Sequence, residues 1–255
     1  MYKVRAKKRF GQHFLTDENI ARKTAESVTL EGYKNVLEIG PGMGMLTKYL
    51  IEKPINLKVV ELDRDSVEYL QAHFLKLSTG IISADFLKED LKQYFGDEPF
   101  AIVGNFPYNI SSQILFKALE YRDQVPEIGG MFQKELAERI ASPHGNKTYG
   151  VISVLLQAFY DIEYLFTVEP EVFNPPPKVK SAVIRLKRNN KKELGCDEKL
   201  FIRTVKQAFS TRRKTLRNCL KSMQPNETVL ASDYMNKRAE QLSVEDFITL
   251  TKMME

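Results

Sequence analysis

Four residues that follow an apolar run carry the clearest chemical signal in the sequence, Asn105-Phe-Pro-Tyr108. Pro107 interrupts the backbone hydrogen bonding of a strand, so the Asn105 side-chain oxygen and a carbonyl on the Pro107 side can accept both hydrogens of an exocyclic amino group. Tyr108 adds a flat face on which a planar ring can stack. The pattern indicates a site for the amino group of a base, and its alternative is an ordinary turn between a strand and a loop.

A glycine-rich loop follows the first expected strand and reads Gly40-Pro-Gly-Met-Gly44. It leads into a helix expected to begin near Thr47, which is where nucleotide-like ligands meet a doubly wound sheet. The loop lacks the third glycine of a dinucleotide site, so it favours S-adenosylmethionine, which has no pyrophosphate. Glu61 ends the next expected strand, where its carboxylate can accept from both ribose hydroxyls of that cofactor.

Two further residues are candidates in the same crevice. Asp85 ends the third expected strand and can accept the adenine amino group of the cofactor, although an Asp at such a position is also a common helix cap. His13 lies just before the first expected helix, whose N-cap we assign to Asp17. We expect His13 to contact the cofactor through its side chain or backbone, in preference to acting as a catalytic base.

A stiff loop with three consecutive prolines follows Phe173. The prolines lock the backbone into an extended form, so Phe173 and Lys178 are held at the two ends of the loop. One interpretation is a wall opposite Tyr108, with Phe173 closing on a base that has been flipped out of its stack. The alternative is a rigid linker.

Short apolar runs alternate with helical patterns between about residues 18 and 120, which is typical of a parallel sheet covered by helices. The expected strands are residues 35–39, 57–61, 80–84, 100–103, 128–132, 161–166 and 181–186. The last two are expected to form an antiparallel pair. The prediction is therefore an α/β, Rossmann-like sheet of about seven strands, the fold of class I S-adenosylmethionine-dependent methyltransferases.

A second, all-helical domain is predicted after a polar run at residues 187–193. Apolar residues at three- and four-residue spacing predict helices at 200–208, 215–223, 231–236 and 244–254, the last with Ser243 and Asp246 at its N-cap. We expect a catalytic cofactor-binding domain over residues 1–187 and a basic RNA-binding domain over residues 188–255.

Positive charge is concentrated at the two ends of the chain. Residues 1–9 hold five bases (Lys3, Arg5, Lys7, Lys8 and Arg9) and no acid, and residues 187–255 hold 15 bases against 9 acids. The stretch 203–221 contains seven bases and no acid, as a phosphate-binding surface requires, and its alternative is a solvated helix face. The candidate RNA contacts in this stretch are Arg212, Arg213, Lys214 and Arg217.

Composition excludes several other classes of protein. The two cysteines, Cys196 and Cys219, lie far apart and only three histidines are present, so we expect reduced, structural cysteines and no metal site. The sequence shows no membrane segment and no secretory signal, which predicts a cytoplasmic protein. No self-complementary apolar surface is evident, and we expect a monomer.

With these residues in hand, the chain resembles the bacterial small-subunit (16S) rRNA adenine N6-dimethyltransferase family over nearly its full length. The motifs that carry the resemblance are Phe10–Leu15, Glu38–Gly42, Glu61–Asp63, Asp85, Gly104–Ser111, Phe173–Ser181 and Ala208–Asn218. The resemblance implies S-adenosylmethionine contacts at His13, Leu15, Gly40, Glu61, Asp85 and Asn105, and a target base against Tyr108 and Phe173. Two positions depart from the family, His13 where many members have Asn and Phe106 where most have Leu.

The implied reaction is N6,N6-dimethylation of two adjacent adenosines in the 3′-terminal hairpin of 16S rRNA, within an immature small ribosomal subunit. S-adenosylmethionine would be the methyl donor, and no metal is implied. Two alternatives stay open. One is the 23S rRNA adenine N6-methyltransferase type that confers macrolide resistance, and the other is an RNA-binding ribosome assembly factor that methylates weakly or not at all.

Overall fold

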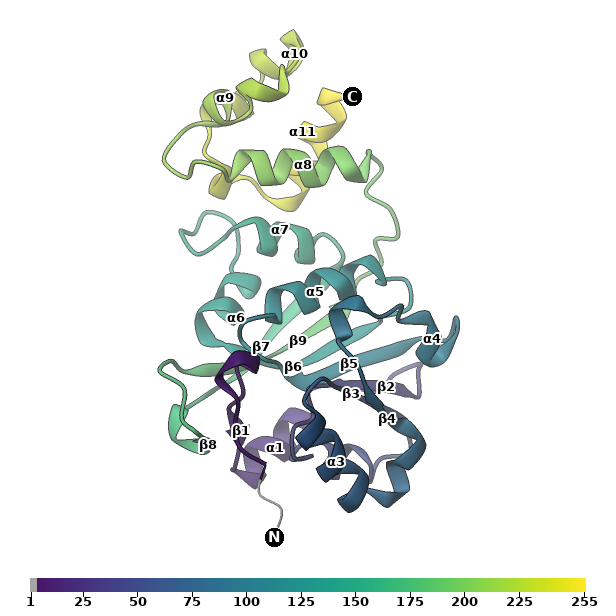
Figure 1. The fold of residues 1–255 in the computed structure, drawn as a ribbon. Coiled ribbons are helices and arrows are strands. Elements are labelled where there is room, and N and C mark those ends of the chain that lie inside the picture. Colours follow the sequence, from purple (N-terminus) through teal and green to yellow (C-terminus); the bar gives the residue numbers. More distant parts are fainter. Residues whose placement is uncertain (1–3) are drawn as a thin grey trace. The chain divides into compact units, whose positions relative to one another are not determined.

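The computed structural model describes residues 4–255, so Lys3 of the basic N-terminal run lies outside the described residues. Seven strands form one sheet in the order β4-β3-β2-β5-β6-β9-β7 (Figure 1). Neighbouring strands from β4 to β6 are parallel, whereas β9 is antiparallel to β6. All seven predicted strands are confirmed, with the bounds β2 Asn35–Ile39, β3 Asn56–Glu61, β4 Ile81–Ser83, β5 Phe100–Asn105, β6 Glu127–Gln133, β7 Tyr160–Val168 and β9 Ser181–Arg188.

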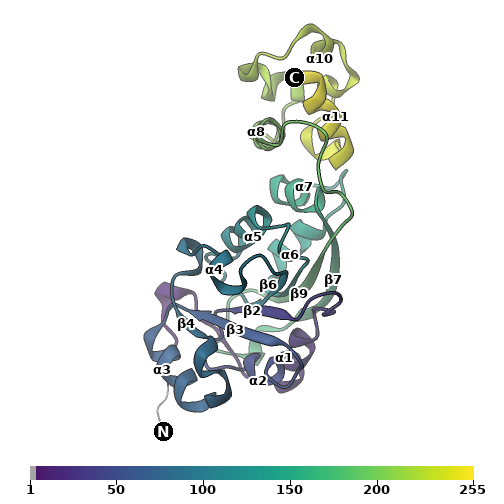
Figure 2. The same ribbon diagram turned by 90° about the vertical axis from the view of Figure 1, so that its right-hand side faces the viewer.

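Helices cover both faces of this sheet, which makes it the doubly wound α/β fold that the sequence predicts. Figure 2 shows α4 and α5 on one side and α1, α2 and α3 on the other. Asp17 caps α1, as predicted, since its side chain accepts a hydrogen bond from Ile20 N at 2.9 Å. The bounds are α1 Glu18–Ala25, α2 Thr47–Leu50, α3 Arg64–His73, α4 Lys92–Phe95 and α5 Ser111–Glu120.

A second sheet of two very short strands was not predicted from the sequence. Strand β1, Phe14–Leu15, pairs antiparallel with β8, Phe173–Asn174, so that Leu15 lies opposite Phe173. Thr16 N extends the pairing by donating to Val172 O at 2.8 Å. Two residues are too few to show a periodic pattern, and the partners lie more than 150 positions apart in the sequence.

The chain divides into two compact units, and each has its own apolar core. One contains the chain up to Ala137 together with Glu163–Arg188, and the other contains Glu138–Ile162 together with Asn189–Glu255. The linear division predicted at 187/188 thus falls one residue before a boundary in the structure, but it does not assign 138–162 to the helical unit. Buried side chains that stabilise the helical unit are Phe201, Val205, Leu220, Phe247 and Leu250.

Two of the four helices predicted in the second unit, 200–208 and 244–254, lie within two residues of the observed bounds. The predicted helix 215–223 is interrupted after Cys219, and the predicted helix 231–236 is a 3₁₀ turn that follows an α-helix ending at Ala231. Ser243 and Asp246 cap the last helix reciprocally, because Ser243 Oγ accepts from Asp246 N at 3.1 Å and Asp246 Oδ2 accepts from Ser243 N at 2.9 Å. The α-helices from the end of β6 onwards are α6 Lys134–Ala141, α7 Val151–Gln157, α8 Glu198–Ala208, α9 Leu216–Cys219, α10 Glu227–Ala231 and α11 Val244–Met254. The 3₁₀ turns are η1 Lys8–Phe10, η2 Leu75–Gly80, η3 Phe86–Lys88, η4 Pro170–Val172, η5 Lys221–Met223, η6 Asp233–Asn236 and η7 Ala239–Gln241. Among residues 4–255, none of these helices is long and apolar enough to cross a lipid bilayer.

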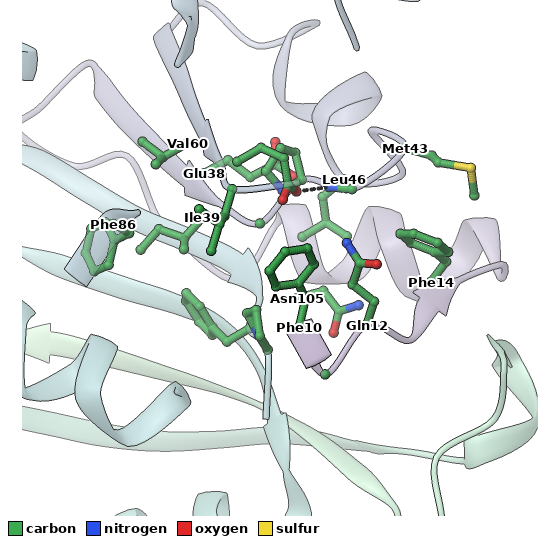
Figure 3. A pocket seen from close by; sticks show the side chains of 18 of the residues that line it. Phe10, Gln12, Phe14, Glu38, Ile39, Met43, Leu46, Val60, Phe86 and Asn105 are labelled. Carbon is green, nitrogen blue, oxygen red and sulfur yellow. Dashed lines mark hydrogen bonds between the residues drawn. The ribbon is translucent and has the colours of Figure 1, made fainter. Parts of the chain in front are cut away.

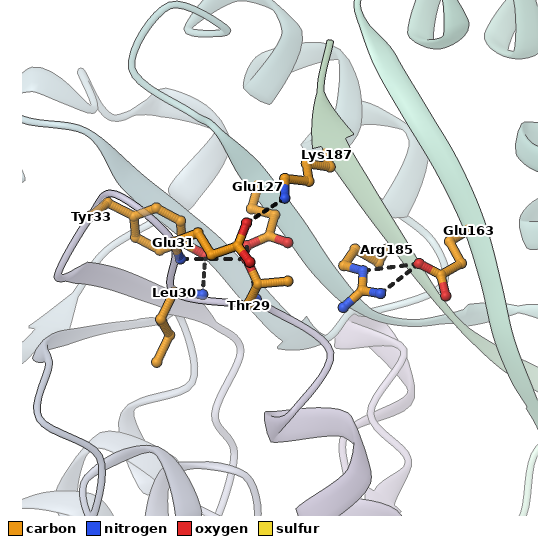
Figure 4. A network of polar contacts seen from close by, with 8 residues as sticks. All are labelled: Thr29, Leu30, Glu31, Tyr33, Glu127, Glu163, Arg185 and Lys187. Carbon is orange, nitrogen blue, oxygen red and sulfur yellow. Dashed lines mark hydrogen bonds and ion pairs between the residues drawn. The ribbon is translucent and has the colours of Figure 1, made fainter.

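A buried carboxylate organises the loop between α1 and β2 (Figure 4). Glu127, only 1% exposed, accepts hydrogen bonds from Tyr33 Oη at 2.5 Å and from Thr29 N at 2.9 Å. Burial and the neighbouring Glu127 charge raise the pKa of the Tyr33 phenol, so it stays protonated and donates. These bonds hold the loop where Leu30 adopts a φ of +62°, a left-handed conformation unusual for a leucine.

We expect Tyr33→Phe to lower the free energy of unfolding by about 1–3 kcal/mol, because it removes a donor from a buried carboxylate. Glu163→Gln is the control, since it disturbs the exposed Glu163–Arg185 ion pair of the same sheet and should cost about 1 kcal/mol or less. Urea denaturation of the three proteins measures both values. Equal losses in the two variants would contradict a special role for Glu127.

Candidate active site

A cavity of about 570 Å³ lies at the carboxyl ends of β2, β3 and β5, the edge where parallel strands of a doubly wound sheet bind ligands. Figure 3 shows Phe10, Gln12 and Phe14 lining it across from Ile39 and Val60. The cavity brings together eight of the predicted site residues, namely His13, Leu15, Gly40, Glu61, Asp85, Asn105, Pro107 and Tyr108.

The glycine loop and Glu61 form one hydrogen-bonded unit. Glu61 Oε2 accepts from Gly42 N at 3.0 Å, and Glu61 Oε1 accepts from Asp63 N at 2.8 Å. Gly42 has a φ of +57°, and a Cβ there would lie 2.9 Å from the ring of Phe14, so the position requires glycine. The loop therefore brings bare backbone to a cavity with a carboxylate on its wall, which fits the amino-acid tail and the ribose of S-adenosylmethionine.

The pKa values of two carboxyl groups next to this loop, Glu38 and Glu61, are raised. Burial raises the pKa of Glu38 to about 8, an effect that a hydrogen bond from Thr47 Oγ1 at 2.7 Å partly offsets and that the Glu61 charge reinforces. Burial also raises the pKa of Glu61, against the bonds from Asp63 N and Gly42 N. The Glu38 carboxyl group is therefore uncharged over most of the pH range below about 8. Glu61 differs from it in having two backbone N–H groups that donate to its carboxylate.

Asp85 caps a turn and also lies in the cavity wall, so its contact with the cofactor stays a prediction. Its Oδ1 accepts from Leu87 N at 3.2 Å, which caps the turn η3, and the residue also lines the cavity. The cap fixes the direction of the carboxyl group without removing it from the cavity wall.

The structure shows which groups at Asn105 and the residues after it are free to accept hydrogen bonds. The β5–β6 pairing ends at Asn105, and Asn105 Nδ2 donates to His13 O at 3.1 Å, which leaves the side-chain oxygen as the free acceptor. The Pro107 carbonyl already accepts from Ile110 N at 3.2 Å. Within residues 4–255 the structure shows no hydrogen bond to the Phe106 carbonyl, so that oxygen is the better second acceptor.

The Tyr108 ring is fixed by its surroundings. Its hydroxyl lies 2.5 Å from Oγ of Ser181, a fully buried residue at the start of β9, and its face stacks on the His13 ring at a centroid distance of 5.5 Å. Burial raises the pKa of the phenol, so the group stays neutral. His13 Nδ1 donates to Pro175 O at 2.8 Å, which ties the histidine to the proline-rich loop.

Of the residues predicted to contact the cofactor or the target base, Phe173 is the one that does not line the cavity. It is 3% exposed and packs in the hydrophobic core, opposite Leu15 in the β1–β8 pair. Its role against a target base stays a prediction.

The sequence reasoning missed several residues around the N-terminal segment. Asp63, 1% exposed, accepts from Lys7 Nζ and from Gln12 Nε2, the latter at 3.1 Å. Burial raises the pKa of Asp63, but the bonds from Lys7 and Gln12 outweigh burial and lower it. Asp63 lies within the Glu61–Asp63 motif, so its position was visible in the sequence although its partners were not.

The four predicted RNA contacts divide into two kinds. Arg212 donates to Lys147 O and to Tyr149 O, the latter at 3.2 Å, and Arg217 donates to Leu230 O at 2.8 Å. Both therefore bind backbone carbonyls of their own unit. All four residues are exposed, but in the part of the chain that the structure describes the side chains of Arg213 and Lys214 form no hydrogen bond or ion pair.

Two other sequence predictions concern cysteines and metals. Cys196 and Cys219 are free thiols, as predicted. Among residues 4–255, no group of three or more His, Cys, Asp or Glu side chains is placed to hold a metal ion.

The sheet order, the glycine loop and the acid at the end of β3 define a class I S-adenosylmethionine-dependent methyltransferase fold. Solved structures agree, although at this identity they bear on the fold alone. A dimethyladenosine transferase from Plasmodium falciparum superposes with a TM-score of 0.78 at 24% identity, covering 93% of this chain and 96% of its own. The 23S rRNA methyltransferase ErmE superposes with a TM-score of 0.71 at 24% identity, covering 94% of this chain and 99% of its own.

Sequence relatives narrow the class to one family. The model of the ribosomal RNA adenine dimethylase family matches residues 3–255. A protein of Flavobacterium johnsoniae named ribosomal RNA small subunit methyltransferase A is 58% identical, covering 100% of this chain and 98% of its own. A protein of the same name from Cytophaga hutchinsonii is 59% identical, covering 100% of this chain and 99% of its own. The chain belongs to the ribosomal RNA adenine dimethylase family, and S-adenosylmethionine is its methyl donor.

The raised pKa of Glu38 predicts how stability depends on pH. This pKa is about 8 in the folded protein, against an ordinary 4.5, so the folded state holds an extra proton between these values. Raising the pH through this range therefore lowers the free energy of unfolding. Glu38→Gln, which keeps an acceptor for Thr47, should be less sensitive to pH. Denaturation of both proteins between about pH 5 and pH 9 measures the difference, and parallel curves would disprove the assignment.

Proposed function

We propose that this protein dimethylates N6 of two adjacent adenosines in the 3′-terminal hairpin of 16S rRNA, within an immature small ribosomal subunit. The observation that carries the proposal is the pair of acceptors at the cavity, Asn105 Oδ1 and the Phe106 carbonyl, beside the Tyr108 ring. The relatives named small subunit methyltransferase A match this chain from end to end and support the choice of subunit. This substrate would place the protein in the cytoplasm, and we propose that it acts as a monomer without a metal.

The acceptors address the main chemical difficulty of the reaction. Adenine N6 is a poor nucleophile because its lone pair is delocalised into the ring. Asn105 and Phe106 would accept its two hydrogens, which favours a pyramidal nitrogen with its lone pair directed into the cavity. Bound S-adenosylmethionine supplies a methyl group on a sulfonium, which needs no further activation. The surplus proton then leaves to water.

Two bonds in the protein prepare the site before the base arrives, one at an acceptor and one at the stacking ring. His13 O holds the amide of Asn105 so that its oxygen, not its nitrogen, faces outward. Ser181 fixes the hydroxyl of Tyr108, which sets the plane on which the adenine would stack. After the first transfer N6 keeps one hydrogen, so one acceptor still orients it for the second.

The helical unit would hold the RNA through its exposed bases. Arg213 and Lys214 are our proposed phosphate contacts, since Arg212 and Arg217 already bind carbonyls in their own unit. This division sharpens the sequence prediction, which treated all four residues alike.

The first test is transfer of labelled methyl groups to small subunits that lack the modification, with large subunits and free RNA alongside. Dimethyladenosine in small-subunit rRNA alone is the expected result. Label in large-subunit RNA would favour the macrolide-resistance type of enzyme. Cofactor binding without any label would favour an assembly factor.

Asn105→Ala should lower kcat by about 10²–10³, because it removes one of two acceptors at the reacting nitrogen. Cofactor binding, measured by calorimetry with S-adenosylhomocysteine, should weaken by about tenfold or less, because Asn105 is one of several expected cofactor contacts and also bonds to His13 O. Asn236→Ala, at an exposed position in the helical unit, is the control and should leave both quantities unchanged. Undiminished turnover in Asn105→Ala would contradict the proposed mechanism.

Removing a phosphate contact should flatten the salt dependence of RNA binding. The slope of log Kd against log salt should fall by about 1 for Arg213→Ala and for Lys214→Ala. For Arg212→Ala we expect a lower free energy of unfolding and a smaller change of slope, because the substitution removes the hydrogen bonds to the Lys147 and Tyr149 carbonyls. Equal slopes in wild type and in the Arg213 and Lys214 variants would exclude these residues as contacts.

A further inference from the structure

A carboxylate that the proposed reaction does not use lies beneath the N-terminal segment, residues 7–16. Asp63 is 1% exposed, and both of its oxygens are occupied by this segment. Lys7 Nζ donates to Oδ1, and Gln12 Nε2 donates to Oδ2 at 3.1 Å. A third bond, from Lys7 N to Gln12 Oε1 at 2.8 Å, joins the two donors to each other. Four side-chain and backbone groups thus form one closed set of contacts.

These contacts connect residues that are distant in sequence. Asp63 is 56 positions from Lys7 and 51 from Gln12, so no local pattern of secondary structure requires the bonds. Lys7 also forms an ion pair with Asp65 at 2.8 Å, in the first turn of α3. The segment is therefore tied to the end of β3 and the start of α3.

Asp63 is also bonded directly to the cofactor wall. Its backbone N–H donates to Glu61 Oε1 at 2.8 Å, and the other oxygen of Glu61 accepts from Gly42 N at 3.0 Å. Any shift of Asp63 would move the carboxylate that is placed to bind the ribose. The side chain and the backbone of one residue thus join the N-terminal segment to the Glu61 carboxylate.

The other end of the segment is held by a different set of contacts. Leu15 pairs with Phe173 in the β1–β8 sheet, and His13 O accepts from Asn105 Nδ2. Between the two ends, Phe10, Gln12 and Phe14 line the cavity. A segment fixed at both ends keeps these side chains in place, and release of the Asp63 end would leave Phe10 and Gln12 without support.

We propose that Asp63 is a positioning residue for the reaction, which holds residues 7–16 over the cofactor cavity through Lys7 and Gln12. The inference rests on the proposed function only in taking this cavity as the S-adenosylmethionine site. Loss of these contacts weakens cofactor binding, because residues 7–16 must then become ordered over the cavity when the cofactor binds. The free energy of ordering them lowers the affinity. The transfer step itself is unchanged once the cofactor is bound, since Asn105 and Phe106 keep their places.

The test compares Lys7→Met, Asp63→Asn and the double variant in the full chain. The probe is S-adenosylhomocysteine, and calorimetry gives its Kd without any RNA. We expect Kd to rise on the order of tenfold in each single variant, the change typical of one charge-assisted hydrogen bond. The Kd of the double variant should not exceed the higher of the two single-variant values, because each single substitution already removes the Lys7–Asp63 contact.

Hydrogen exchange supplies a second readout that does not depend on activity. Amides of residues 9–16 should become protected when the ligand binds wild type, and this protection should be reduced in the variants. At saturating cofactor, kcat on small subunits should match wild type while KM for S-adenosylmethionine rises. Gln12→Met gives an independent test if Asp63→Asn fails to fold.

Two control variants separate the contact from general effects of charge. Lys7→Arg keeps a charged donor and should retain wild-type affinity. Lys92→Met breaks the exposed Lys92–Asp97 pair at 3.2 Å, outside the cavity lining, and should leave Kd unchanged. Wild-type Kd and wild-type protection in both Lys7→Met and Gln12→Met would overturn the inference. Failure of wild type itself to bind the probe would instead refute the proposed function.

Discussion

The site depends on the point at which the backbone hydrogen bonding of β5 stops. The strand lies between β2 and β6 in the middle of the sheet, and it is buried and fully paired up to Val103. Pro107 cannot donate, so pairing cannot continue, and the Phe106 carbonyl is left at the cavity beside Asn105. A central strand gives this open end a rigid position, which an edge strand or a loop would not provide. The stacking ring of Tyr108 follows directly because it comes next in the chain.

Those parts of the fold that leave a periodic or local pattern in the sequence could be predicted. Apolar runs located all seven strands of the large sheet, and the alternation with helices gave the parallel order that places Gly40, Glu61 and Asn105 at one edge. The helix cap at Ser243 was also visible, because its partner Asp246 is three residues away. In each case the information lies within a short window of residues or in a general rule of α/β topology.

Contacts between distant segments could not be predicted in this way. The bond between Asp63 and Gln12, the β1–β8 pair and the burial of Phe173 each join residues more than 50 positions apart. The basic stretch shows a related limit, because its composition gives charge but not direction. Arg212 and Arg213 are exposed neighbours of the same type, yet within residues 4–255 only the first forms hydrogen bonds to backbone carbonyls. Whether an exposed guanidinium also reaches backbone carbonyls is decided by the packing around it.

The wall of the cavity has two parts of different origin. Most of its wall belongs to elements between β2 and α5, which also build the large sheet, whereas Phe10 and Phe14 belong to a strip of chain outside that sheet. Substitutions in the strip can therefore alter the shape of the cavity while the scaffold stays intact. In an evolving lineage, or in protein engineering, this separation would let ligand affinity vary without loss of the fold.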